Sequence, residues 1–308
     1  MAFLVIKLGA LGDFIQAFGP FSAIRSYHRG ARIVLLTTEP YKELAEASGY
    51  FDEVWTGGRP SVTDIAAWVD LRRRLVKGSF NRVYDLQTSD RSSFYHYLFW
   101  PGAVPEWSGV ARKCSHPHKN PQRDTLHTIE RQAEQLRAAG ICSVPSPNLS
   151  ALKFGHSDDF SRFGLFGSYA ILIPSGSASR PYKRWPPDSF IALARILSKQ
   201  KITPVFLGTE SERNFIETIA SECQGARNLA GETSLLDLFS LSFGAKVAVG
   251  NDTGPMHIMA STGCSSVILF SNDSDPLLCG QRGPSVTILR RDKLLDIGVP
   301  EVVKALAL

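Results

Sequence analysis

The sequence has few cysteines and no long apolar run. Its five cysteines, among 308 residues, form no CxxC pair, which argues against a disulfide framework or a zinc site and favours a reducing compartment. We expect all five to be small buried thiols. No apolar run approaches the roughly 18 residues of a membrane span. The N-terminal stretch MAFLVIKLGALGD lacks a basic leader and a cleavage site, so we expect a cytoplasmic protein that begins with a strand.

The chain also lacks the charge pattern of a nucleic-acid-binding protein. The net charge is +5, with 44% hydrophobic and 20% charged residues, as in ordinary globular proteins. Four Lys and Arg, two His and no acid occupy the segment 112–123, RKCSHPHKNPQR. Such a loop suits an anionic glycan or a phospholipid surface. Nucleic acid is the weakest partner because no interleaved aromatics or binding motif accompany the loop. A solvated loop without any partner is the alternative.

Strand and helix patterns alternate along the chain. The predicted strands are 3–8, 32–37, 53–55, 82–86, 169–173, 203–207, 246–249 and 266–270. The predicted helices are 12–27, 40–48, 64–77, 92–100, 125–139, 188–199 (capped by Asp188), 210–223 and 234–243. Two further segments, 286–289 and 300–308, close the chain. Repeated βα units predict parallel sheets that are covered on both faces.

The segment 143–168 interrupts this alternation, so we place a domain boundary near residue 155. The sequence therefore predicts an α/β protein with two doubly wound domains, 1–155 and 156–308, and a cleft between them. Ligands of such sheets bind beyond the C-terminal ends of the strands, so the loops at those ends are the places to search for a site.

The most informative of these loops is GNDTGPMH, residues 250–257. It follows an apolar strand and opens an apolar helix that ends near Gly263. A fresh helix N-terminus presents unpaired N–H groups and a positive dipole end, which suits a phosphate or diphosphate. The alternative is that residues 251–253 simply cap a buried helix.

Three further loops carry candidate residues. After the first strand, Gly9 and Gly12 allow the backbone to approach a ligand, and Asp13 is either a helix-dipole partner or a general base. Only a loose dinucleotide fingerprint is present there, without a third glycine. The loop at 174–179 and its basic continuation suit phosphate oxygens. Gln87 and Arg91, after the strand at 82–86, suit an anionic or hydroxylated acceptor.

These residues together resemble one family. KLGALGD at 7–13, DLQxxxR at 85–91, KxWP at 183–186 and DTGPMH at 252–257 occur in this order. The chain resembles glycosyltransferase family 9, the heptosyltransferase family, over roughly residues 3–290. The resemblance implies the GT-B fold, in which two Rossmann-like domains face each other across a cleft. The N-terminal domain handles the acceptor and the C-terminal domain the nucleotide-sugar, and a final helix often returns to the first domain.

The resemblance also implies roles for particular residues. Asp13 matches the catalytic base, and Lys183 matches the lysine that contacts the donor diphosphate. The ribose-binding acid falls at Glu212, with Glu210 as the alternative. Together with the loops above, the donor-binding residues are Ser175, Gly176, Ser179, Lys183, Glu212, Thr233, Asp252, Thr253, Gly254 and His257. The acceptor-binding residues are Gly9, Gly12, Gln87, Arg91, Arg112 and Lys113.

The reaction implied is the inverting transfer of a heptose from an ADP-sugar to an anionic glycolipid of the lipopolysaccharide inner core. We expect no cofactor and no metal, because Asp273-Ser274-Asp275 is more simply interpreted as a turn than as a metal-binding pair. The relatives often have serines where this chain has Gly9 and Ala10, which leaves the acceptor's identity open. The aromatic run 94–100 fits contact with the inner face of the cytoplasmic membrane, with a packed helix as the alternative. A sugar-nucleotide epimerase and a non-catalytic nucleotide-sugar binder remain as rival functions.

Overall fold

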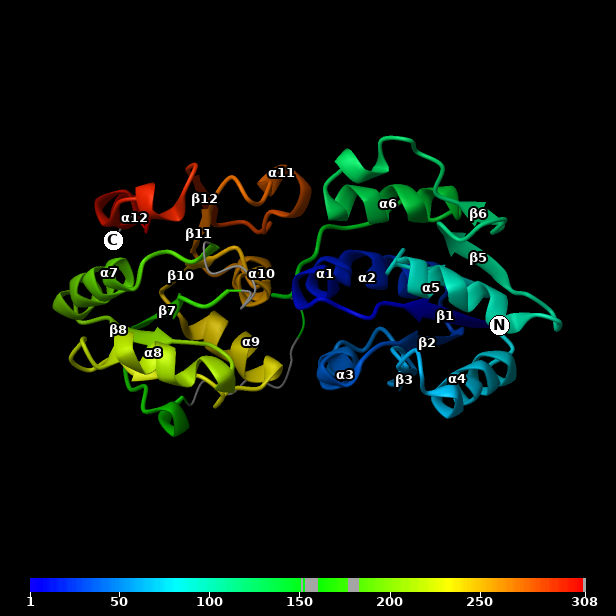
Figure 1. The fold of residues 1–308 in the computed structure, drawn as a ribbon, viewed down its shortest axis with the longest axis horizontal. Coiled ribbons are helices and arrows are strands. Elements are labelled where there is room, and N and C mark those ends of the chain that lie inside the picture. The colour runs from blue at the N-terminus through cyan, green and yellow to red at the C-terminus, as the bar shows by residue number, and fades with distance from the viewer. Residues whose placement is uncertain (151, 153–159, 177–182, 307–308) are drawn as a thin grey trace. The chain divides into compact units, whose positions relative to one another are not determined.

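The chain forms two compact α/β units. The computed structural model describes residues 1–150, 152, 160–176 and 183–306, and the contacts divide the chain into Met1–Pro147 and Asn148–Leu308. Each unit contains one six-stranded parallel sheet (Figure 1). Residue 155, where the sequence analysis places the boundary, lies outside the described residues.

The first sheet has its earliest strand near the centre. Its strands are β1 (Ala2–Ile6), β2 (Arg32–Leu36), β3 (Glu53–Trp55), β4 (Arg82–Asp85), β5 (Glu106–Gly109) and β6 (His116–Pro117). They lie in the order β3-β2-β1-β4-β5-β6. The chain thus proceeds from β1 to one edge and then crosses to β4 on the other side of β1. The loops after β1 and β4 diverge at this switch point, which is where ligands of doubly wound sheets bind.

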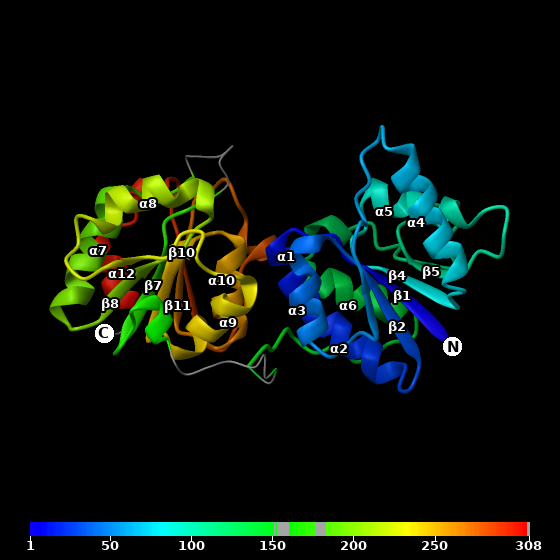
Figure 2. The same cartoon turned by 90° about the horizontal axis from the view of Figure 1, so that it is seen from below.

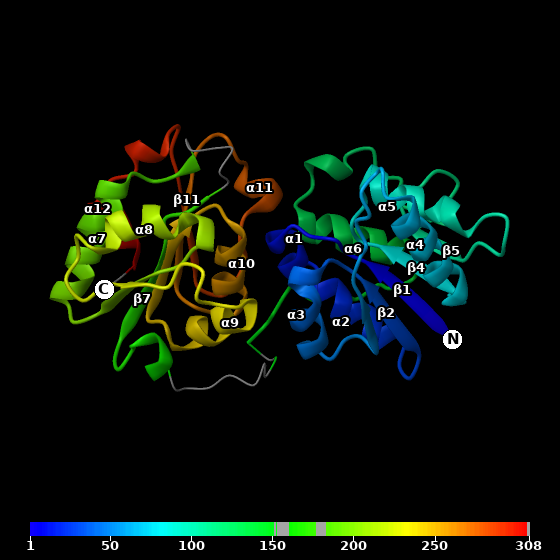
Figure 3. The same ribbon diagram turned by 60° about the horizontal axis from the view of Figure 1, so that its bottom comes forward.

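Helices cover both faces of the first sheet. They are α1 (Leu11–Gln16), α2 (Phe18–Tyr27), α3 (Lys42–Ala47), α4 (Ile65–Lys77), α5 (Asp90–Tyr95) and α6 (Thr128–Ala138), with 3-10 turns η1 (Glu39–Tyr41), η2 (His96–Phe99) and η3 (Arg123–Thr125). Leu4 and Ile6 of β1 share a core with Leu71 and Leu75 of α4, and α4 and α5 lie side by side (Figure 3). Successive side chains of a strand point to opposite faces of the sheet, so the sheet has a second face to cover. A second group of helices, α1, α2 and α6, packs together elsewhere in the unit.

The second sheet repeats this topology. Its strands are β7 (Tyr169–Ile173), β8 (Thr203–Phe206), β9 (Arg227–Asn228), β10 (Val247–Asn251), β11 (Ser266–Phe270) and β12 (Val286–Arg290). Their order is β12-β11-β10-β7-β8-β9, the same arrangement read from the other edge. The switch point therefore lies between β7 and β10, and the motif at 250–257 begins with the last two residues of β10.

The second unit buries its sheet between two groups of helices. These are α7 (Pro187–Lys199), α8 (Arg213–Ala220), α9 (Leu235–Gly244), α10 (Gly254–Ser261), α11 (Pro276–Cys279) and α12 (Val299–Leu306), with 3-10 turns η4 (Ser161–Phe163), η6 (Glu210–Glu212) and η7 (Leu294–Asp296). Figure 2 shows α7, α8 and α12 on one face and α9 and α10 on the other. The final helix places Val302 and Leu306 in the core of this unit.

Several local predictions need correction. The helix predicted at 12–27 is two helices that meet at Ala17, and the helix at 92–100 becomes the 3-10 turn η2 after Tyr95. Helix α7 is preceded by Pro186 as its N-cap, so Asp188 lies in the first turn and does not cap it. Three cysteines are buried, whereas Cys142 is exposed and Cys279 is only half-buried.

Candidate functional site

The loop after β1 carries Asp13 at the switch point of the first sheet. Gly9 adopts a φ of 109°, and a Cβ there would lie 2.7 Å from Cε2 of Tyr41, so the turn requires glycine. The chain then enters α1, whose first turn contains the buried Gly12 and the half-buried Asp13. Within the described residues the Asp13 carboxylate has no hydrogen-bond partner. It is therefore available to accept a proton from a ligand.

Two buried ionisable side chains lie at this switch point: Lys7 directly follows β1, and Asp85 ends β4. The Lys7 Nζ donates to the carbonyl oxygen of Leu86 at 3.1 Å. Burial lowers the pKa of Lys7, and the charges of Asp13 and Asp85 oppose that effect. Burial raises the pKa of Asp85 to about 6, although hydrogen bonds from its own loop oppose the rise. Asp13 thus lies within electrostatic reach of a buried lysine, a feature that the sequence analysis missed.

Gln87 ties the loop after β4 to the loop after β1. Its Oε1 accepts a hydrogen bond from the N–H of Leu8 at 2.8 Å, and its own N–H donates to Asp85 Oδ1 at 3.1 Å. The side chain predicted to bind an acceptor therefore also fixes the geometry of the two loops near Asp13.

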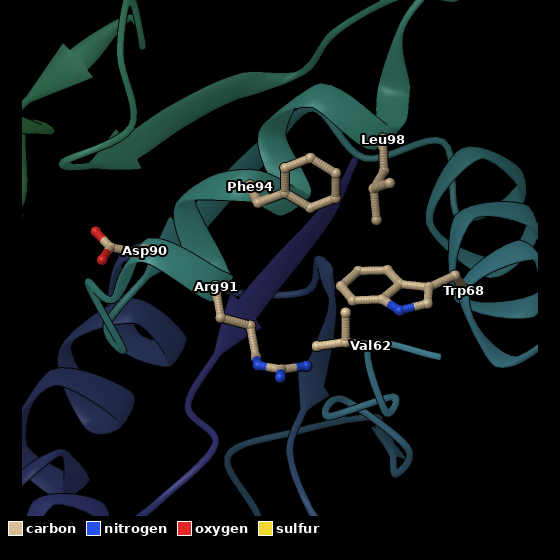
Figure 4. A pocket seen from close by; sticks show the side chains of 6 residues that line it. All are labelled: Val62, Trp68, Asp90, Arg91, Phe94 and Leu98. Carbon is tan, nitrogen blue, oxygen red and sulfur yellow. The ribbon is translucent and has the colours of Figure 1, made fainter. Parts of the chain in front are cut away.

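Arg91, in α5, is held beside an apolar cavity. Its Nη1 donates to the carbonyl oxygen of Pro60 at 2.7 Å, and its guanidinium lies 5.9 Å from the centre of the Trp68 ring. Both Arg91 and Trp68 line a cavity of about 600 Å³ (Figure 4). The cation predicted to contact the acceptor thus borders an apolar surface.

The basic segment 112–123 contributes a residue that the sequence analysis did not select. Arg112 and Lys113 lie exposed in the turn after β5. Arg123 instead reaches the loop after β4, where its Nη2 donates to Thr88 Oγ1 at 3.2 Å. The positive charge of Arg131, in α6, also lowers the pKa of Lys7. The switch point of the first sheet is therefore rich in charged groups.

Asn251 organises the corresponding switch point in the second sheet. Its side chain is fully buried. The Oδ1 accepts from the N–H of Trp185 at 2.9 Å, and the Nδ2 donates to the carbonyl oxygens of Pro174 and Ser175 at 2.9 and 3.2 Å. The predicted donor-binding residues Ser175 and Gly176 are therefore held next to the end of β10. The predicted residue Ser179 lies outside the described residues.

Helix α10 begins at the motif without a side-chain cap. Thr253 is the N-cap residue, but its side chain makes no capping hydrogen bond. The Thr253 Oγ1 is buried and has no partner within the part of the chain that the structure describes. Asn251 bonds elsewhere, and Asp252 Oδ1 accepts from Gln281 Nε2 at 3.1 Å. The interpretation of residues 251–253 as a simple side-chain cap is therefore wrong. Pro255 has no N–H, and the Met256 N–H donates to the carbonyl oxygen of Thr253 at 3.2 Å, so within the described residues the N–H of Gly254 is the first-turn donor that is left for an anion.

The remaining motif residues, Gly254 and His257, lie in the first turns of α10. Gly254 is the first residue of α10, and His257 is buried one turn further along. Gly176 lies beside this turn, because a Cβ at Gly176 would be 3.9 Å from Thr253 Cγ2. The loops after β7 and β10 thus converge, as the switch-point rule requires.

Lys183 and Arg184 add positive charge near these loops. Lys183 Nζ donates to Ser274 Oγ. Arg184 donates to the carbonyl oxygen of Gly176 at 2.9 Å and lies 3.8 Å from Glu212 Oε1. A diphosphate at the start of α10 would therefore have cationic side chains from the KxWP segment within its own unit.

Glu212 and Thr233 occupy helix-entry positions. Glu212 Oε2 accepts from the N–H and the hydroxyl of Thr209, at 3.0 and 2.8 Å, in a capping box. The acid that the resemblance assigns to ribose binding thus has a capping role in this structure. Thr233 is half-buried and directly precedes Ser234, the N-cap of α9.

The pair Asp273 and Asp275 lies in a turn, as predicted. Asp273 Oδ2 accepts from Ser271 Oγ at 2.8 Å, and Asp275 Oδ1 caps α11 by accepting from Leu277 N–H at 3.1 Å. Across the described ranges, no group of three or more His, Cys, Asp or Glu side chains is placed to hold a metal ion.

Comparison with known proteins identifies the family. A model of glycosyltransferase family 9 (heptosyltransferase) matches residues 68–295. Lipopolysaccharide heptosyltransferase 2 of Salmonella typhimurium is 34% identical over 104 residues, which are 32% of this chain and 30% of that protein. The chain therefore matches less than a third of that relative's length. The lipopolysaccharide core heptosyltransferase OpsX of Haemophilus influenzae is 22% identical over 288 residues. These residues are 87% of this chain and 78% of the OpsX chain.

The fold of the whole chain is similar to that of a protein whose structure has been solved. The structure of E. coli ADP-heptose lipopolysaccharide heptosyltransferase II superposes with a TM-score of 0.84 and 20% identity, covering 100% of this chain and 98% of that one. This confirms the predicted GT-B fold with its two Rossmann-like domains. Because the family model spans most of its length, the chain belongs to glycosyltransferase family 9, the heptosyltransferase family.

Proposed function

We propose that this protein transfers a heptose from an ADP-sugar to an inner-core lipopolysaccharide acceptor, with inversion at the anomeric carbon. The observation that carries the proposal is the start of α10, which has no side-chain cap and whose Thr253 hydroxyl has no partner among the described residues. A nucleoside diphosphate offers the negative charge and the acceptor oxygens that such a helix start binds. The names of the relatives, one of which specifies ADP-heptose, support the same donor.

The second unit would stabilise the leaving group. Negative charge grows on the diphosphate as the bond to the sugar breaks. The N–H of Gly254, the positive end of the α10 dipole and the ammonium of Lys183 would stabilise that charge. One preorganised donor of this kind is worth about 3–4 kcal/mol of barrier. This electrostatic contribution would replace a metal ion, so we propose that transfer requires neither a metal nor a cofactor.

The first unit would activate the acceptor. Asp13 removes the proton of the acceptor hydroxyl as that oxygen attacks the anomeric carbon. An anionic acceptor would find cations at Arg91, Arg112, Lys113 and Arg123. Because the acceptor is a lipid, we propose that the protein works on the inner face of the cytoplasmic membrane.

A transfer assay tests the function directly. The protein would be incubated with ADP-heptose and an inner-core acceptor, and the acceptor would be analysed by mass spectrometry. We expect a gain of one heptosyl unit, undiminished by a chelator. Loss of activity in chelator with recovery in magnesium would contradict the metal-free mechanism. A changed sugar-nucleotide without any acceptor would indicate an epimerase, and binding without turnover would indicate a non-catalytic binder.

A further inference from the structure

Exposed apolar side chains gather on α4, α5 and η2 of the first unit and in the segments next to them. Val62 is 80% exposed, Ile65 76% and Trp100 73%. Phe94 and Tyr97 are half-exposed in the same region. Figure 4 shows Trp68, Phe94 and Leu98 arranged around the cavity described above. Exposed apolar clusters of this kind usually mark a surface that another body covers.

The outer stripe of α4 combines apolar and positively charged residues. Ile65, Val69, Arg72 and Val76 are all exposed, and their spacing of three and four residues places them on one side of the helix. Arg73 is also exposed, next to Arg72.

The acids of α4 are directed away from this stripe. Asp70 lies about 140° around the helix from Ile65. Asp64 is occupied as the N-cap, where its Oδ1 accepts from the N–H of Ala67 at 2.9 Å. The side of α4 that carries Ile65 and Val69 therefore presents Arg72 without an acid. Arg73 lies three residues from Asp70, on the same side of the helix as that acid, and the exposed Asp90 lines the neighbouring cavity.

Arg72 connects this stripe to the aromatic residues. Its Nη2 donates to the carbonyl oxygen of Trp100 at 3.2 Å. The α4–α5 surface, defined as Val62, Ile65, Val69, Arg72, Arg73, Val76, Phe94, Tyr97 and Trp100, is thus continuous across two elements. Arg91 borders it beside the cavity, which joins the surface to the residues proposed for the acceptor.

We propose that the α4–α5 surface docks on an anionic phospholipid bilayer. Aromatic rings are favoured at the level of the lipid headgroups, and arginines among them pair with lipid phosphates. Within the described residues no helix is long and apolar enough to cross a membrane, so the surface would lie on the interface. This docking goes beyond the transferase activity and does not require it.

Vesicle flotation tests the proposal. The full chain would be mixed with vesicles of phosphatidylcholine alone or of phosphatidylcholine and phosphatidylglycerol in equal parts. We expect binding to the anionic vesicles, weakened by high salt. The variant Val62→Ser/Ile65→Ser/Val69→Ser is expected to lose binding by about tenfold or more, because it removes buried apolar area at the interface. Arg72→Glu/Arg73→Glu should lose binding to anionic vesicles by charge repulsion.

A matched variant in the second unit controls for general hydrophobicity. Phe166, Leu277 and Leu295 are 85%, 74% and 66% exposed, and the corresponding triple serine variant is expected to float like the unmodified protein. Equal melting temperatures would show that all variants are folded. The proposal is overturned if the unmodified protein does not bind anionic vesicles, or if both triple variants behave alike.

A second readout separates this proposal from the proposed function. The α4–α5 serine variant is expected to transfer sugar to a lipid-free inner-core oligosaccharide at the unmodified rate, while losing vesicle binding. Vesicle binding without any sugar transfer would contradict the transferase and support the docking surface. Transfer without vesicle binding would support the transferase and reject the docking surface.

Discussion

The two sheets share one strand order but differ in the chemistry of their switch points. In the first, Lys7 directly follows β1 and Asp85 ends β4, and both are buried and ionisable. In the second, the end of β10 carries the neutral amide of Asn251, which fixes its loops through three hydrogen bonds. Equivalent positions in one topology thus hold titratable groups in one unit and an amide in the other.

This difference indicates a division of work between the units. A site for proton transfer benefits from ionisable neighbours that influence a carboxylate. A site that binds a diphosphate benefits from dipoles that keep their sign at every pH, such as the start of α10. We therefore assign proton removal to the first switch point and donor binding to the second, and the following changes test that assignment.

Replacing Asp13 should give the largest effect. Asp13→Asn removes the base but keeps the shape of the side chain, so we expect turnover to fall by about 100- to 10,000-fold. Steady-state kinetics would measure it. Calorimetry should show unchanged ADP affinity, since the proposed donor-binding residues lie in the other unit. Near-normal turnover would remove Asp13 from the role of base.

Asp85 should make stability depend on pH. Its folded pKa is raised to about 6, so the folded state retains the proton that the unfolded chain releases near pH 4. Its contribution to stability is full below pH 4 and is lost as pH rises through 6. The free-energy difference between the unmodified protein and Asp85→Asn should therefore fall by roughly 2 kcal/mol from pH 4 to pH 7.

Urea unfolding at the two pH values would measure this change. Asn251→Ala is the control from the second unit, because it removes buried hydrogen bonds without removing a titratable group. We expect its cost in stability to be similar at both pH values. If the free-energy difference between the unmodified protein and Asp85→Asn is also the same at both pH values, Asp85 is not a buried carboxyl that titrates in this range.

Lys183 should affect the donor alone. Lys183→Ala removes one charge-assisted contact to the diphosphate, and we expect ADP affinity to fall by about tenfold. Isothermal calorimetry would measure the change. Lys199→Ala, an exposed lysine at the end of α7, serves as the matched control and should bind ADP normally. Equal affinities in the two variants would place the diphosphate elsewhere.

Thr253 distinguishes ligand binding from helix capping. The Thr253 hydroxyl makes no cap hydrogen bond, so Thr253→Val should change stability by less than about 0.5 kcal/mol. Loss of one hydrogen bond to the diphosphate should weaken ADP binding by about fivefold. Ser234→Ala, which removes a true cap of α9, should cost about 1 kcal/mol of stability. Equal stability losses would restore the capping interpretation.

Much of the fold could be predicted from local patterns because its central strands are continuous apolar runs. The strands at 32–36, 169–173 and 266–270 are of this kind. The sequence analysis missed β5, β6 and β9, which lie toward sheet edges. β6 and β9 have only two residues each, so tertiary pairing, not local propensity, defines them.

The site could be predicted only where a motif carried it. DTGPMH located the start of α10, but the buried roles of Lys7 and Asp85 depend on the pairing of β1 with β4, which no local pattern reveals. A charged residue at the end of an apolar strand was the available signal for both. The sequence does not distinguish Arg123 from the other Lys and Arg residues of the segment 112–123. Its hydrogen bond to Thr88, which the structure shows, distinguishes it.

Hydrogen–deuterium exchange upon addition of ADP tests the division of work most directly. The account predicts slower exchange in the second unit, in peptides that contain residues 174–176, 208–212 and 252–257. It predicts no comparable change at residues 7–13 or 86–91 of the first unit. Protection confined to the first unit's loops, or no protection in either unit, would contradict it.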